Sequence, residues 1–197
     1  MEFSFENRYD RDLVKSFTDE LITRDFSDIA TYFRSVDGPT PEILWSPTSA
    51  ELDEGALRVP LDYWIELPRG QDLPLASALD PLQMRGALGL VMLLDVEDDG
   101  WDYRYRVYGT TIAERSGFDA TGKLISELDL QPMGPFFIAS YRAFFESRGY
   151  MFSRHVPPLR SHTTSWDRII LPLEGEGGQI NRLLVGNVPG TWCAEVS

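Results

Sequence analysis

The chain has 197 residues and a formal net charge of −13, with 31 acidic and 18 basic side chains. A surface this negative repels phosphate groups, so we expect neither nucleic acid nor an anionic membrane as a partner. The hydrophobic fraction of 43% is sufficient for a packed core.

The single cysteine, Cys193, permits no intrachain disulfide, which favours a reducing compartment. The N-terminal residues have neither the basic region nor the apolar run of a signal peptide, and no apolar stretch approaches the ~20 residues that span a bilayer. We therefore expect a cytoplasmic protein.

The first quarter of the chain predicts two helices and a linker. A helix over 10–22 can be capped by Asp10, and Leu13, Phe17 and Leu21 recur on one of its faces. A shorter helix is expected over 27–33. Prolines and small polar residues follow, and they are typical of a linker. We take residues 1–55 as an N-terminal helical extension and linker.

The next segment predicts a helix and a hairpin. A helix ends before Pro68, and the nearly continuous apolar run 88–96 has the length of a strand buried on both faces. An acidic turn leads into a strand over 101–108. Its alternation places Tyr103, Tyr105 and Val107 on one face and Arg104 and Arg106 on the other.

The last part predicts a long helix over 135–148 with a proline in its first turn, followed by strands over 150–156, 163–173 and 180–188. The economical arrangement is an α+β fold, a five-stranded antiparallel sheet with helices on one face. It occupies residues 56–190 and leaves 191–197 as a tail.

The order of these elements and the motifs along them resemble the PAS sensor fold and, more narrowly, the bacterial family PAS_5. The segments that carry the resemblance are 61–70, 73–74, 80–81, 93–96, 103–110, 117–122 and 169–173. The likeness spans about 57–188. It implies a single-domain signalling protein, a sensor or adaptor of unknown ligand to which no enzymatic residue is assigned.

A PAS fold implies a cavity between the sheet and its helices. The side chains expected to face it, as a ligand site or as filled core, are Tyr103, Tyr105, Arg106, Val107, Phe137, Tyr141, Phe144, Trp166 and Arg168. An inward arginine needs an acid or an anionic ligand, because an unpaired buried charge costs several kcal/mol. Strand alternation puts Arg106 opposite Tyr105, so one of the two faces solvent.

No cofactor, metal or catalytic residue is predicted. His155 and His162, with Asp167 nearby, lack a recognised ligand spacing. The 135–148 helix has no histidine for haem, and Cys193 in the tail is poorly placed for flavin photochemistry. Noncovalent flavin binding stays open.

We therefore expect a non-enzymatic sensory or adaptor protein of bacterial signalling that binds a small ligand, a partner such as a histidine kinase, or both. Leu13, Phe17 and Leu21 can pack on their own sheet or form a homodimer interface, and we predict the homodimer. One alternative is an enzyme on a nuclear-transport-factor-like cone fold, which requires an inward histidine–carboxylate pair. Another is a structural dimerisation module without a cavity.

Overall fold

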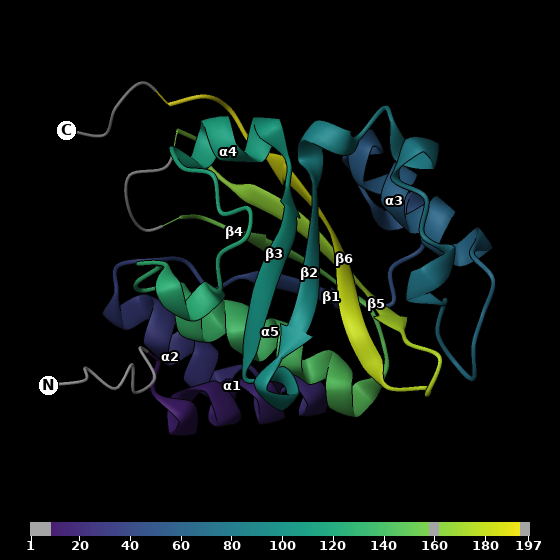
Figure 1. Ribbon diagram of the computed structural model, residues 1–197. Coiled ribbons are helices and arrows are strands. Elements are labelled where there is room, and N and C mark those ends of the chain that lie inside the picture. Colours follow the sequence, from purple (N-terminus) through teal and green to yellow (C-terminus); the bar gives the residue numbers. More distant parts are fainter. Residues whose placement is uncertain (1–8, 158–161, 194–197) are drawn as a thin grey trace, which may run out of the picture.

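A six-stranded antiparallel sheet forms the centre of the computed structural model, which describes residues 9–157 and 162–193 (Figure 1). The strands follow the spatial order β1-β4-β5-β6-β2-β3, and every neighbouring pair is antiparallel. They are β1 Glu42–Trp45, β2 Val91–Glu97, β3 Asp102–Tyr108, β4 Met151–His155, β5 Trp166–Glu174 and β6 Ile180–Pro189. The α-helices are α1 Arg11–Thr23, α2 Ser27–Ser35, α3 Gly55–Glu66, α4 Thr110–Ser116 and α5 Gly134–Ser147.

The two predicted long helices form where local capping allows them. The Asp10 carboxylate accepts hydrogen bonds from the backbone N–H groups of Asp12 and Leu13, at 2.9 and 3.3 Å, and so begins α1. Pro135 lies in the first turn of α5, where its missing N–H has no cost. α5 ends at Ser147, and the capping residue Arg148 adopts the left-handed conformation.

The predicted α+β fold with an antiparallel sheet is confirmed, with differences in detail. A sixth strand, β1, lies within the predicted linker and pairs with β4 at the sheet edge. Residues Leu88–Leu90 form a 3₁₀ turn, so β2 starts only at Val91. β5 begins at Trp166 rather than at residue 163. The boundaries proposed between extension, domain and tail stay a prediction.

Helices cover both faces of the sheet, whereas the prediction placed them on one. α5 packs on one face of the sheet, and α1 packs against α5. α3 lies on the opposite side of the sheet in Figure 1. Gly186 in β6 shows how closely α3 approaches, because a Cβ there would lie 3.0 Å from side-chain atoms of Leu57 and Pro60. Every residue of the central strand β5 is therefore buried.

The apolar stripe of α1 faces the protein's own core. Phe17 and Leu21 are fully buried and Leu13 is half-buried against the same core. The Phe17 ring packs edge-on against Tyr32, with centroids 5.2 Å apart. These residues are thus not a free dimer interface, because α5 and α2 already cover them. The homodimer itself stays a prediction.

Within the part of the chain that the structure describes, no helix combines the length and the apolar character needed to cross a lipid bilayer.

Candidate functional site

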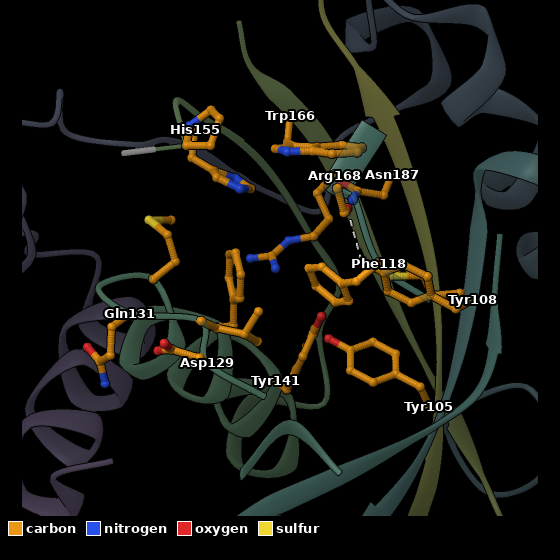
Figure 2. A pocket seen from close by; sticks show the side chains of 16 residues that line it. Tyr105, Tyr108, Phe118, Asp129, Gln131, Tyr141, His155, Trp166, Arg168 and Asn187 are labelled. Carbon is orange, nitrogen blue, oxygen red and sulfur yellow. Dashed lines mark hydrogen bonds between the residues drawn. The ribbon is translucent and has the colours of Figure 1, made fainter. Parts of the chain in front are cut away.

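A cavity of about 500 Å³ lies between α5 and the face of the sheet that α5 covers (Figure 2). The sheet, α4, α5 and the segment before α5 contribute its walls. The lining residues are Met92, Tyr105, Tyr108, Ser116, Phe118, Asp129, Leu130, Gln131, Met133, Phe137, Tyr141, His155, Pro157, Trp166, Arg168 and Asn187. Asp129 and Gln131 are solvent-exposed, whereas His155, Arg168 and Tyr141 are buried. The volume is in the range that holds a small molecule.

Pairing between strands places the polar side chains of the cavity in one row. Arg168 of β5 is directly opposite Ser153 of β4 and Asn187 of β6, and directly paired residues share a face. His155 and Trp166 form the next pair along β4 and β5. The central strand therefore presents Trp166 and Arg168 to the same cavity.

A β-bulge decides which residues of β3 face inward. The register shifts between Leu93 and Leu94 of β2, which pair with Val107 and Tyr105, so β3 has one additional residue at this point. The alternation is interrupted, and Tyr108 lines the cavity in place of Val107. The prediction that Val107 faces the pocket is wrong because of this bulge.

Arg106 is also not a pocket residue. Its side chain is exposed and forms an ion pair with Asp95, which accepts a second hydrogen bond of 2.8 Å from Arg182. This network lies on the solvent-exposed side of the β2–β3 edge. Arg106 and Arg182 therefore pair with an acid of the same surface and need no ligand.

Five of the predicted pocket residues do line the cavity: Tyr105, Phe137, Tyr141, Trp166 and Arg168. Tyr103 and Phe144 are instead fully buried in the core next to it. The Tyr103 hydroxyl donates to the Gly100 carbonyl at 3.1 Å, and Phe144 packs against the Trp45 ring at 5.6 Å. Ligand binding by the five lining residues stays a prediction.

Arg168 is the main electrostatic feature of the site. Only 2% of the residue is exposed, and no carboxylate of the described residues forms an ion pair with it. Its guanidinium lies 4.5 Å from the Phe137 ring centroid, and Nη2 reaches the Ser140 hydroxyl only at 3.5 Å. Burial lowers the pKa of Arg168, although an arginine stays charged at neutral pH.

His155 lies in the same cavity and is neutral at physiological pH. Burial, together with the positive charge of Arg168, lowers the pKa of His155 well below its ordinary value. Its ring packs against Phe137, with centroids 5.3 Å apart. Asp129 lines the exposed mouth, but no hydrogen bond joins it to His155 among the interactions of the described residues. Among the residues that the structure describes, Arg168 rather than a carboxylate is thus the charged neighbour of His155.

Tyr105 and Tyr108 of the cavity are neutral phenols. Burial raises the pKa of Tyr105, and it raises that of Tyr108 to about 12. The Tyr108 and Ser116 hydroxyls are 3.1 Å apart. The phenols can therefore exchange hydrogen bonds with a ligand but supply no negative charge to Arg168.

Three buried polar atoms of the cavity walls have no hydrogen-bond partner: Nε of Arg168, Nδ1 of His155 and Oδ1 of Asn187. Such atoms are rare in folded proteins, and each costs about 1–3 kcal/mol. All three residues line the same cavity. Sequence reasoning did not find His155 or Asn187 as pocket residues, because only strand pairing places them beside Arg168.

The remaining metal and cofactor candidates lie elsewhere. His162 stacks on Trp192 outside the cavity, with ring centroids 4.9 Å apart, and Asp167 binds Arg154. The described residues contain no group of three potential ligands that could hold a metal ion. The described lining residues also include no cysteine.

Comparison with known proteins identifies the family. The family model PAS_5, described as a PAS domain, matches residues 53–184, which is more than half of the chain. The chain therefore belongs to the PAS domain family, a class of sensory and signalling domains. The search of curated proteins finds no match.

A solved structure that resembles the chain is that of an RNA-binding light-oxygen-voltage receptor. The two share 12% sequence identity with a TM-score of 0.44, and the match covers 90% of this chain and 53% of that chain. The chain thus spans about half the length of that receptor.

Proposed function

We propose that this protein is a non-enzymatic sensor of bacterial signalling that binds a small molecule in the cavity between α5 and the sheet. The observation that carries the proposal is the convergence of Arg168, His155 and Asn187, with their unpartnered atoms, on one cavity. In a structural module with a filled core, buried polar side chains are normally hydrogen-bonded. Occupation of the cavity then shifts the conformational equilibrium that a partner protein reads.

The cavity supports sensing better than catalysis. His155 is the only histidine among the described lining residues, and its charged neighbour is Arg168 rather than a carboxylate. A general base needs a partner that orients it, and a nucleophile within hydrogen-bond reach. We therefore assign the protein to ligand-dependent contact with a partner such as a histidine kinase, in the cytoplasm.

Native mass spectrometry and an absorption spectrum of freshly purified protein test the proposal. We expect a copurified small molecule, released on unfolding, in the wild type. Ser116→Trp should abolish it, because the indole fills the cavity from the end of α4. Glu114→Trp, at an exposed position of the same helix, is the matched control and should retain the molecule.

The same spectrum reports a noncovalent flavin directly. A protein that never holds a small molecule, even after incubation with cell extract, would contradict a ligand sensor. Titration with RNA tests the expectation from net charge, and saturable binding at physiological salt would overturn it.

A further inference from the structure

We propose that the cavity binds a small planar monocarboxylate, whose charge is neutralised by Arg168. This inference rests on the sensory function proposed above and names the class of ligand. It also assigns Arg168 as the residue that distinguishes an acid from its neutral analogue.

The charge argument starts from burial. Arg168 is 2% exposed, and the described part of the chain supplies no carboxylate to it. The adjacent acid, Asp167, faces the other side of β5 and binds Arg154 through two hydrogen bonds of 2.8 and 2.6 Å. A buried cation without a counter-ion is unfavourable, and an anion entering the cavity would remove this cost.

The geometry of the guanidinium favours a carboxylate. Its flat face is occupied by the Phe137 ring at 4.5 Å, and Tyr141 lies 5.4 Å away. At its edge, Nη2 lies 3.5 Å from the Ser140 hydroxyl and Tyr141 is a second hydrogen-bond partner, whereas Nε has no partner. A carboxylate matches this edge with two parallel N–H···O bonds. Figure 2 shows the guanidinium directed into the space enclosed by the labelled side chains.

The cavity can neutralise one negative charge of a ligand but not two. Arg168 is the only lysine or arginine among the described lining residues, and His155 is held neutral beside it. Asp129 adds a negative charge at the mouth. A phosphate dianion would leave an uncompensated charge in the cavity, which favours the carboxylate.

The remaining walls favour a planar body. Aromatic side chains of Tyr105, Tyr108, Phe118, Phe137 and Trp166 surround the space, and Tyr108 and Phe118 stack at 5.8 Å. Flat rings make favourable stacked or edge-on contacts with such walls. The unpartnered Oδ1 of Asn187 can accept a hydrogen bond from a ligand hydroxyl or N–H group.

Calorimetric titration with benzoate, 2-naphthoate and indole-3-acetate, each beside its carboxamide, tests the inference. We expect at least one acid to bind about ten-fold or more tightly than its amide, since hydrogen bonds to charged groups contribute about 1.5–3 kcal/mol. Arg168→Met should remove this preference. Arg168→Lys should restore part of it, because it keeps the charge but not the planar edge.

Arg106→Met, the same substitution on the exposed side of β3, is the matched control and should bind the acids like the wild type. Thermal unfolding confirms that each variant is folded. Equal binding of acid and amide, binding of none of the acids, or a preference that persists in Arg168→Met would overturn the inference. A copurified neutral molecule combined with any of these results would leave the sensory function standing.

Discussion

Arg168 and Asp167 are neighbours on β5, yet they have different electrostatic environments. Asp167 is opposite Arg154 on β4 and forms a two-point ion pair with it. Arg168 is opposite Ser153 and Asn187, neither of which carries a charge. The alternation of side chains along a strand therefore separates a paired acid from an unpaired base.

This environment predicts that Arg168→Met stabilises the ligand-free protein. Methionine retains most of the buried apolar stem and removes an unpartnered charged donor, which should raise the free energy of unfolding by about 1–3 kcal/mol. Urea unfolding of protein stripped of ligand measures the change. A lower stability in the variant would mean that the guanidinium supports the fold rather than a ligand.

His155 predicts a loss of stability in mild acid. Its pKa is lowered by burial and by Arg168, so the folded protein keeps the ring neutral while the unfolded chain takes up a proton below about pH 6.5. The free energy of unfolding should therefore fall with decreasing pH, by at most about 1.4 kcal/mol for each pH unit. His155→Asn should flatten this dependence between about pH 6.5 and 5.

Thermal unfolding across this pH range measures the effect. The decrease should survive the same substitution at His162, which lies outside the cavity. An unchanged decrease in His155→Asn would show that another group takes up the proton.

At the scale of elements, the end of β5 holds the proline-bearing loop between α3 and the 3₁₀ turn Ala76–Ala78. The buried Glu174 carboxylate accepts hydrogen bonds from the backbone N–H groups of Gln71, Asp72 and Leu73, and from Arg148 at 2.7 Å. Gly70 has no room for a Cβ because this carboxylate occupies the space. One side chain thus connects the loop, α5 and the sheet.

Glu174→Gln should lower the melting temperature at neutral pH. Burial by itself raises the pKa of Glu174, but the backbone N–H groups and Arg148 outweigh it and lower the pKa overall. Its stabilisation is therefore present above about pH 4.3 and is lost as the pH falls below that value. Wild type and variant should converge in acid.

Differential scanning calorimetry from pH 7 to 3 measures this convergence, with the exposed neighbour Glu176→Gln as control. A constant difference at all pH values would exclude the charge of Glu174 as the cause.

At the scale of the whole molecule, burial of the α1 stripe affects how a dimer could form. Phe17→Ala should lower the free energy of unfolding by about 3–5 kcal/mol, because Phe17 is fully buried within one chain. The loss should not depend on protein concentration, and the exposed Lys15→Ala should have little effect. Light scattering together with urea unfolding at two concentrations measures both properties. Weaker self-association of Phe17→Ala at unchanged stability would place this stripe at a dimer interface.

The sequence by itself determined the order of the elements apart from β1, the Asp10 cap of α1, the proline start of α5 and the antiparallel character of the sheet. These features depend on local chemistry: the Asp10 cap, the proline in the first turn of α5 and short connections between strands. The motifs along them were sufficient to identify the PAS family.

Tertiary structure decided which side chains meet in the cavity. β5 is buried on both faces, so its sequence has no alternation that assigns Arg168 to the cavity and Asp167 to the other side. The bulge in β3 exchanged Val107 for Tyr108, since one additional residue reverses the facing of all that follow. His155 and Asn187 reach the site only through pairing between strands distant in the chain, and such pairing depends on the packing of the whole sheet.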